Sequence, residues 1–282
     1  MMLRTRRFIW RAGRRLYMGA RKEAPNHITS KGEGRLQRLV ADRVRLGSRL
    51  TVFDVGARIG EWSKSIMGFA ARRPEGYEVH AFEPVPESRL ALEKSYKSQV
   101  ENRTLRVNPF GLSNTVGSFP IYIPHLTAGT STLHPDASIR YEQVLQVATT
   151  TVDRYCQENS IDQIDLLKVD TEGHDLRVIE GALQNLKGGR VGVLQFEYNH
   201  RWIYSRTYLR DVFELARDTP YRVAKVCSGA LEIYVEWHPE LERFFETNFA
   251  LVHEQLVETL GCRVLKIGRD NACEAVAIAG AG

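Results

Sequence analysis

Short apolar segments alternate with amphipathic ones through the middle of the chain. Apolar runs of strand length predict β-strands at 49–54, 77–83, 103–108, 164–169 and 191–197. The segments between and after them predict helices at 60–71, 86–97, 174–187 and 207–217. The helix at 174–187 shows a buried face most clearly, because Leu176, Ile179, Leu183 and Leu186 recur at helical spacing. This alternation predicts an α/β fold with a doubly wound, mostly parallel sheet that helices cover on both faces.

Further elements flank this alternation. Leu36, Leu39, Val40 and Val44, followed by Gly47, predict a helix before the first strand. An insertion at 114–160 contains two strand-like stretches, "GSFPIYIP" and "EQVLQVATTTVD", joined by a Gly/Ser/Thr-rich loop. After residue 220 four more stretches are strand-like: "YRVAKV", "ALEIYVEW", "NFALV" and "CEAVAIAG". We expect two or three of them to be antiparallel strands at one edge of the sheet.

No linker separates a second folded unit. We therefore expect an N-terminal arm at 1–30 and one domain at 31–282, with its core at about 50–235. No apolar run approaches the roughly 18 residues that span a bilayer. The four cysteines are not spaced like the ligands of a metal site. We therefore expect them to be reduced thiols in a cytoplasmic protein. The composition does not predict an oligomeric state.

Basic residues are concentrated at the N-terminus. Residues 1–22 contain eight of the 39 basic residues and no acidic one, so 31 basic residues face 34 acidic ones in the rest. That remainder gives no reason to expect a nucleic-acid partner. In the arm, arginines alternate with Phe8, Ile9, Trp10, Leu16 and Tyr17. Three interpretations stay open: a solvated, partly helical tail, peripheral contact with an anionic membrane surface, or a mitochondrial transit peptide.

The stretch "TVFDVGARIG" at 51–60 has the form of a nucleotide-binding turn, in which a strand leads into a helix. A dinucleotide fingerprint needs three glycines, whereas this turn has only Gly56 and Gly60. Asp54, at the tip of the strand, would repel a pyrophosphate and attract a cation. Both features favour S-adenosylmethionine, which carries a sulfonium and an ammonium group and no phosphate.

The second predicted strand ends in "HAFEP". Glu83 lies 29 positions after Asp54, where a doubly wound nucleotide fold places an acid that accepts both ribose hydroxyls. Each acid also has a structural explanation, Asp54 as a helix cap and Glu83 as a solvated strand end. Their joint position at the ends of the first two strands favours an adenosyl cofactor.

Five segments resemble the FkbM family of S-adenosylmethionine-dependent methyltransferases: "FDVGARIGEWS", "VHAFEPVPESRLALE", "GLSN", "TTTVDRYC" and "IDLLKVDTEGHDLRVIEGA". The resemblance covers about residues 50–200 and implies a Rossmann-like class I methyltransferase sheet. It also implies methylation of hydroxyl oxygens, often on sugars of bacterial surface polysaccharides or on polyketides, so we expect a sugar hydroxyl of a glycan or glycoconjugate as acceptor. The family usually has Asn where this chain has Arg58, and Glu where it has Asp175. The expected cofactor-binding residues are Asp54, Gly56, Ala57, Arg58, Gly60, Glu83, Pro84 and Leu112.

Candidate catalytic residues follow the fourth predicted strand, in "KVDTEGHD". Asp170 and Glu172 are two apart in an extended segment, so they point the same way and would act as base or share a Mg²⁺ ion. We expect a reaction without metal and keep Mg²⁺ as the alternative. His174 is expected to be exposed at a helix start, and Asp175 to cap that helix. Lys168, two positions before Asp170, is expected to pair with a carboxylate at most and receives no predicted catalytic role.

The fifth predicted strand is followed by His200, whose near-neutral pKa suits general-base catalysis. An exposed loop histidine explains it equally well. The predicted catalytic set is therefore Asp170, Glu172 and His200.

Three other functions compete with this hypothesis. An NAD(P)-dependent sugar oxidoreductase or epimerase is disfavoured by the missing third glycine and by Asp54. A nucleic-acid methyltransferase is disfavoured because "NPFG" at 108–111 only faintly resembles the amino-methylating motif and follows the wrong strand. A catalytically inactive S-adenosylmethionine-binding module stays open because of Arg58.

Overall fold

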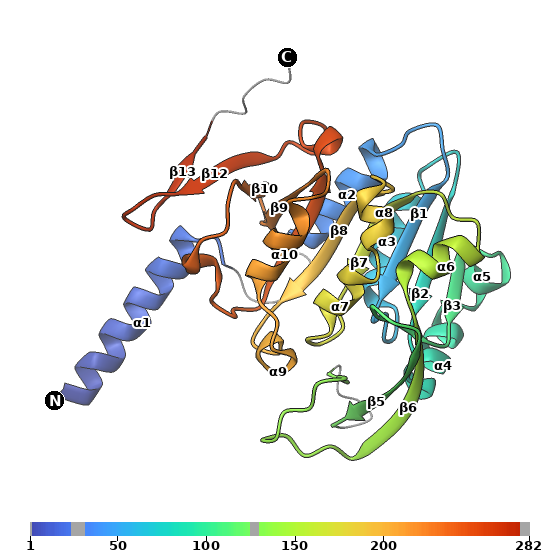
Figure 1. Cartoon of the computed structure of the whole chain (residues 1–282), viewed down its shortest axis with the longest axis horizontal. Coiled ribbons are helices and arrows are strands. Elements are labelled where there is room, and N and C mark those ends of the chain that lie inside the picture. The colour runs from blue at the N-terminus through green and yellow to red at the C-terminus, as the bar shows by residue number, and fades with distance from the viewer. Residues whose placement is uncertain (1, 24–31, 125–129, 277–282) are drawn as a thin grey trace.

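A parallel five-stranded sheet forms the centre of the molecule (Figure 1). The computed structural model describes residues 2–23, 32–124 and 130–276. The central strands lie in the order β3 (Leu105–Asn108), β2 (Tyr77–Phe82), β1 (Leu50–Val55), β7 (Ile164–Val169) and β8 (Val191–Tyr198). Val52 of β1 lies opposite Val79 of β2 and Leu166 of β7, so apolar residues continue across neighbouring strands. All five predicted strands are present, with ends shifted by one or two residues.

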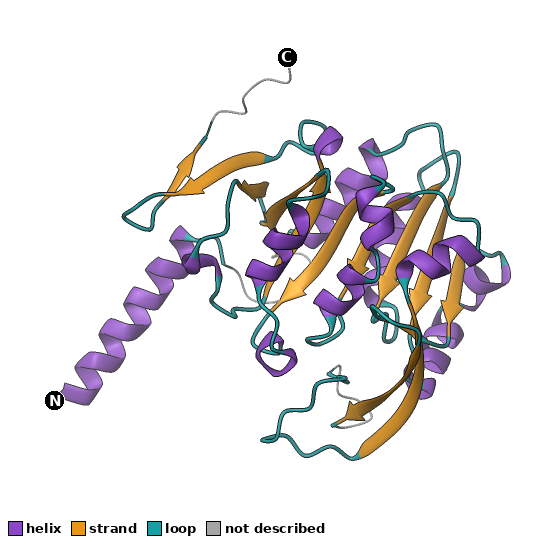
Figure 2. Cartoon of the chain, viewed as in Figure 1, coloured by secondary structure: helices purple, strands orange, loops and turns teal. Residues whose placement is uncertain are grey.

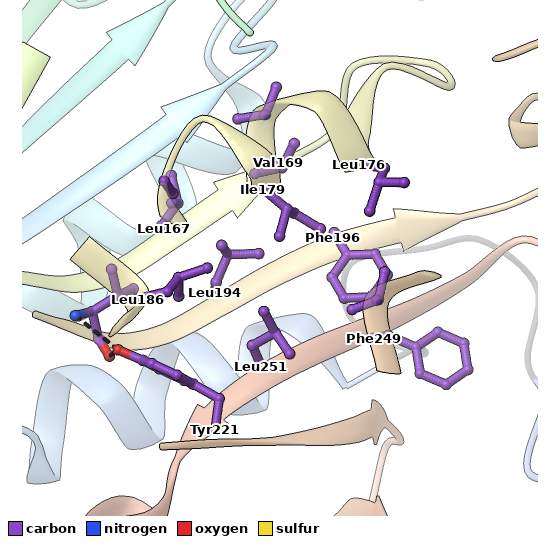
Figure 3. Close-up of a cluster of buried hydrophobic side chains, with 14 of the residues drawn as sticks. Leu167, Val169, Leu176, Ile179, Leu186, Leu194, Phe196, Tyr221, Phe249 and Leu251 are labelled. Atoms are coloured by element: carbon purple, nitrogen blue, oxygen red, sulfur yellow. Dashed lines mark hydrogen bonds between the residues drawn. The ribbon is translucent and has the colours of Figure 1, made fainter. Parts of the chain in front are cut away.

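Helices cover both faces of this sheet, as the predicted doubly wound fold requires. On one face, Val52 and Leu166 pack with side chains of α2 (Glu33–Arg43), α3 (Glu61–Ala70) and α4 (Pro86–Ser95). On the other, Phe53 and Leu167 pack with α6 (Val152–Glu158), α7 (Asp175–Glu180), α8 (Leu183–Lys187) and α10 (Leu209–Ala216). Figure 3 shows part of this second core, where β7, β8 and the helices meet. Two short helices, α5 (Lys97–Glu101) and α9 (Trp202–Ser205), complete the connections.

The single helix predicted at 174–187 is wrong, because the chain forms two helices, α7 and α8. A Cβ on Gly181, between them, would lie 2.0 Å from the Ser113 carbonyl oxygen. The close approach of the chain at Ser113 therefore ends α7 at this point.

Five more strands extend the sheet beyond β8, which is more than the two or three predicted. β11 (Thr247–His253) runs antiparallel to both β8 and β9 (Tyr221–Val226), and β10 (Leu231–Tyr234) runs antiparallel to β9. β12 (Arg263–Ile267) and β13 (Cys273–Ala275) form the outer edge, and β12 had no sequence prediction. Single-turn helices η1 (Pro239–Leu241) and η2 (Glu254–Leu256) connect these strands.

The insertion forms a small second sheet. β5 (Gly117–Ile123) and β6 (Gln143–Thr150) of the insertion pair with each other, and β4 (Gly111–Leu112), just before the insertion, pairs with β6. Figure 2 shows β5 and β6 beyond the end of the main sheet to which the parallel strands point. Ile121, Ile123 and Val147 pack on Val85, which follows β2, so this β5–β6 hairpin covers the carboxyl edge of the sheet.

The N-terminal arm forms α1 (Met2–Ala20), which projects from the body (Figure 1). Within the described residues, no helix combines the length and the apolar character that crossing a bilayer demands. All four cysteines are free thiols.

Candidate functional site

The turn after β1 lies at the point where the strand order reverses. β2 and β3 lie on one side of β1, and β7 and β8 lie on the other. A Cβ on Gly56 would lie 2.0 Å from the Asp170 carbonyl oxygen, and the residue has φ +76°. Only glycine fits here, because the turns after β1 and β7 touch through their backbones. In open α/β sheets this is where ligands bind.

Backbone N–H groups of this turn are bonded within the protein. Those of Gly56 and Ala57 both donate to the Phe82 carbonyl oxygen, at 3.1 and 3.2 Å, and that of Gly60 donates to the Ala57 carbonyl oxygen at 2.8 Å. The Arg58 N–H donates to Glu83 Oε2 at 2.7 Å. These four N–H groups therefore have no hydrogen left for an anionic ligand.

Glu83 is nearly buried at the end of β2. Its Oε1 accepts a second bond, from the Val85 N–H at 2.9 Å. Burial raises the pKa of Glu83, and the two backbone N–H donors oppose that shift. Each carboxylate oxygen has accepted one bond and retains a second lone pair, so both can accept a ligand hydroxyl.

A pocket opens beside Glu83, with an empty volume of about 520 Å³ that includes space open to solvent. The main sheet contributes residues that follow its strands, and the second sheet contributes mostly apolar side chains. The former include Gly56, Glu83, Pro84, Thr171 and His174, and the latter include Leu112, Ile121, Leu133 and Val147. Of the predicted cofactor set, Gly56, Glu83, Pro84 and Leu112 line this pocket.

Lys168 lies buried beneath the turn and connects β7, its own strand, to β1. Its Nζ is 3.1 Å from Asp54 Oδ1, 3.5 Å from Asp170 Oδ2 and 3.2 Å from the Gly56 carbonyl oxygen. Burial acts to lower the pKa of Lys168, but the Asp54 and Asp170 carboxylates outweigh it and raise the pKa above its ordinary value. The sequence named Lys168 as a possible partner of a carboxylate, but did not predict its pairing with Asp54.

Asp54 is fully buried and does not line the pocket. Besides Lys168, it accepts a hydrogen bond from Ser63 Oγ at 2.6 Å. We expected its charge to face the ligand, whereas the structure places Lys168 against it. Arg58 and Gly60 shape the turn through their backbones, because both have positive φ, +51° and +85° respectively.

Asp170 and Glu172 follow β7 but have different surroundings. The Asp170 side chain is 40% exposed. Glu172 is more buried, and its Oε2 lies 2.6 Å from Arg201 Nε. Burial and the nearby Asp170 charge raise the pKa of Glu172 to about 8, while Arg201 acts in the opposite direction. Among the residues that the structure describes, no group of three or more His, Cys, Asp or Glu side chains is arranged to hold a metal ion.

His174 is buried, so the prediction that it is exposed is wrong. Its Nε2 lies 2.9 Å from Ser113 Oγ, and its Nδ1 lies 3.0 Å from Nε2 of His134 in the β5–β6 connection. Burial, reinforced by His134 and Arg177, lowers the pKa of His174 to about 3, so the ring is neutral at pH 7. The prediction that Asp175 caps its helix is wrong: Asp175 is the first residue of α7, and its carboxylate accepts from the Thr171 and Gly173 N–H groups of the turn before the helix.

Two further contacts join the connection between β5 and β6 to the main sheet. Thr132 Oγ1 donates to the Glu172 carbonyl oxygen at 2.7 Å, and Tyr204 OH donates to Asp136 Oδ2 at 2.6 Å. No sequence signal pairs these residues, which are 40 and 68 positions apart. His200, the third predicted catalytic residue, is exposed in the turn after β8 and does not line the pocket.

The Methyltransferase FkbM domain model matches residues 54–223. The chain belongs to the FkbM methyltransferase family. The identification made from sequence motifs is thereby confirmed, and the match includes the Gly56 turn, Glu83, Lys168 and Asp170. The α1 helix and β10 to β13 lie outside it.

Similar proteins include a curated relative and solved structures. The curated relative of this FkbM chain, methyltransferase sdnD of Sordaria araneosa, is 27% identical over 169 residues, which are 50% of this chain and 63% of sdnD. Methyltransferase FkbM from Methylobacillus flagellatus KT has a TM-score of 0.46 and 15% identity over 75% of this chain and 47% of its own. An O-methyltransferase from Bacillus cereus has a TM-score of 0.42 and 14% identity over 84% and 88%. The chain thus spans less than two thirds of the length of sdnD and of the Methylobacillus protein.

Proposed function

We propose that this FkbM-family chain is an S-adenosylmethionine-dependent O-methyltransferase that acts on a hydroxyl group of a sugar in a glycan or glycoconjugate. The observation that carries the cofactor is the bonding of the turn after β1. A pyrophosphate binds free backbone N–H groups at such a turn, and here Gly56, Ala57, Arg58 and Gly60 have already used theirs. The site is therefore suited to a nucleoside without phosphate.

The residues of the pocket fit an adenosyl group. Glu83 offers one free lone pair on each oxygen, which matches two vicinal ribose hydroxyls. The apolar side chains of the β5–β6 hairpin provide a surface for a base, and Gly56 lets a ligand approach the backbone closely. Arg58 contributes its backbone rather than its side chain to this arrangement, so its difference from the family's usual Asn leaves the Glu83 contact intact.

When bound, S-adenosylmethionine would supply a methyl carbon activated by the sulfonium. The acceptor oxygen forms the new C–O bond, the S–C bond breaks, and the products are a methyl ether, S-adenosylhomocysteine and one proton. Asp170 is the exposed carboxylate at this edge, and we assign it the role of accepting the hydroxyl proton or holding the hydroxyl in line. Lys168 fixes that carboxylate from below.

The competing oxidoreductase hypothesis has little support at this site. Tyr221 and Lys225 have the Tyr-x-x-x-Lys spacing of a hydride-transfer pair, but they lie in β9, away from the lining of the pocket. Tyr221 OH donates to the Val191 carbonyl oxygen, and Lys225 Nζ donates to that of Arg21. Both side chains therefore form hydrogen bonds that stabilise the fold. The sugar acceptor rests on the family resemblance.

Calorimetric titration with S-adenosylmethionine and with NAD tests the cofactor. We expect binding of the first only, and Glu83→Gln should weaken it by one to two orders of magnitude, about 1.4–3 kcal/mol, because one ribose hydroxyl loses its acceptor. Glu87→Gln, an exposed carboxylate on α4, is the matched control and should bind normally. Binding of NAD without S-adenosylmethionine would overturn the proposal.

A further inference from the structure

The α1 helix has two chemically opposite faces. Its Met2–Ala20 sequence contains six arginines and no acidic residue. At 100° per residue, Arg4, Arg7, Arg11, Arg14 and Arg15 fall on one side of the helix. Phe8, Ala12, Leu16 and Ile9 fall on the other side, and Trp10 and Leu3 lie at its border; the sixth arginine, Arg6, lies between Ile9 and Trp10. The helix is therefore a basic amphipathic helix.

The apolar face of α1 has no cover in the part of the chain that the structure describes. Leu3, Phe8, Ile9, Trp10 and Leu16 are between 60% and 86% exposed. Other large exposed apolar residues, such as Leu90, Val116 and Val144, are scattered over the body. Single exposed apolar side chains are ordinary, whereas a contiguous exposed stripe indicates an interaction surface.

The last turn of α1 is fixed to the body. Arg21 Nη2 lies 2.6 Å from Glu240 Oε2, and Tyr17 OH donates to the same carboxylate at 3.2 Å. The Arg243 guanidinium lies 4.4 Å from the centre of the Tyr17 ring, and Lys22 pairs with Glu232. These contacts hold the helix in a set direction, so the projection in Figure 1 is a built feature of the fold.

We propose that α1 docks on an anionic membrane surface, with its apolar face among the lipid chains and its arginines at the headgroups. Only this kind of partner complements both faces at once. A nucleic acid would pair with the arginines and leave the apolar stripe in water. A second copy of α1 would cover the apolar stripe but leave the arginines of both copies without an anionic partner. Figure 2 shows the free end of α1 on the side to which the parallel strands point, so docking brings this edge of the body toward the bilayer.

Sedimentation of the full chain with vesicles tests this proposal. Vesicles of phosphatidylcholine with phosphatidylserine should bind it, and vesicles of phosphatidylcholine alone should bind it much less. Arg7→Gln/Arg11→Gln should weaken binding by about 30-fold, since each basic residue near an anionic surface contributes about 1 kcal/mol. Phe8→Gln/Ile9→Gln should abolish it. The melting temperature should stay unchanged, because all four side chains are exposed.

Matched controls separate the helix from general surface chemistry. Leu90→Gln on α4 and Arg154→Gln on α6 remove an exposed apolar and an exposed basic side chain from the body, and both should bind vesicles normally. Undiminished binding by Phe8→Gln/Ile9→Gln would overturn the proposal. So would self-association through α1 in sedimentation velocity without vesicle binding, which would identify a second copy as the partner. S-adenosylmethionine affinity is measured on the same variants, so failure here and failure of the proposed methyl transfer are told apart.

Discussion

Gly56, Arg58, Gly60 and Glu172 all have positive φ at the candidate site. For arginine and glutamate this conformation costs roughly 1–2 kcal/mol. Glu172 offsets the cost through Arg201 and through Thr132, which donates to its carbonyl oxygen. Arg58 gains the bond from its N–H to Glu83. Asn, the usual family residue at this position, tolerates the left-handed region better, so Arg58 supplies the same backbone shape at higher cost.

Asp170→Asn tests the chemistry at the scale of one residue. We expect turnover to fall by about two orders of magnitude, because the amide cannot accept the hydroxyl proton. Cofactor affinity should stay within a few-fold, since the side chain does not line the pocket beside Glu83. Asp162→Asn, an exposed carboxylate before β7, is the control.

Chelation distinguishes the roles open to Asp170. Loss of turnover with EDTA and recovery with Mg²⁺ would assign it to a metal site with Glu172. Insensitivity to EDTA would leave it as base or orienting acceptor. Full activity of Asp170→Asn would remove it from the mechanism and direct attention to His200.

The environment of Asp175 predicts that the stability of the folded protein depends on pH. Burial, together with the Asp170 charge, raises its pKa from about 4 to about 7. The folded chain then holds a proton that the unfolded chain releases, so the stability that Asp175 contributes is greatest below pH 4 and is lost as pH rises toward 7.

Denaturant unfolding of Asp175→Asn at several pH values measures this effect. The free energy of unfolding of the wild type should fall relative to the variant by up to about 1.4 kcal/mol per pH unit between pH 4 and 7. Asp218→Asn, which is exposed, should track the wild type. A constant difference between wild type and Asp175→Asn across this range would show that Asp175 titrates normally.

The sequence predicts the position of Glu83 and Asp170 at the carboxyl edge of the sheet, because each directly follows its own strand. It could not predict the contact of Lys168 with Asp54, because the two residues become neighbours only through the pairing of β1 with β7. A similar reason explains the error for His174, whose partner Ser113 follows β4 and whose partner His134 lies in the β5–β6 connection.

At the scale of secondary structure, the β5–β6 hairpin brings the insertion onto the carboxyl edge of the main sheet, a contact that the sequence alone does not predict. Its strands were predicted from their alternation, but its position over the carboxyl edge depends on Val85, Ile121 and Val147 packing together. The outer strands show a different limit. β12 is short and only one of its five residues is buried, so it lacks the apolar pattern that revealed β7 and β8. The helix break at Gly181 depends on contact with Ser113, which local pattern does not contain.

Thr132→Val tests how this hairpin is held. The change keeps the shape of the side chain but leaves the Glu172 carbonyl oxygen and the His134 N–H without their partner. Local opening of β5 and β6 should become easier by about 1–3 kcal/mol, measured by amide hydrogen exchange. Thr104→Val, at a surface turn before β3, is the control. Unchanged exchange in β5 and β6 would show that apolar packing alone holds the hairpin.

At the scale of the whole molecule, one hydrogen-bonded sheet separates two cores. The five parallel strands and the outer strands β9 to β13 belong to this sheet, and both cores continue from β1 to β9 or β10. Such continuity predicts that the body unfolds as one cooperative unit. The candidate pocket lies between this sheet and the second one, so a ligand that occupies it stabilises the folded state of both.

Thermal unfolding with S-adenosylhomocysteine measures that linkage. A ligand that binds only the folded state, present at 100 times its Kd, adds about 2.7 kcal/mol to the free energy of unfolding. For a chain of this size the melting temperature should rise by roughly 5–10 °C, in one transition, because each kcal/mol corresponds to about 2–4 °C. Glu83→Gln at the same ligand concentration should show a much smaller rise, since its affinity is lower. Two transitions, of which only one shifts, would show that the outer strands unfold separately from the pocket and that the sheet does not couple them.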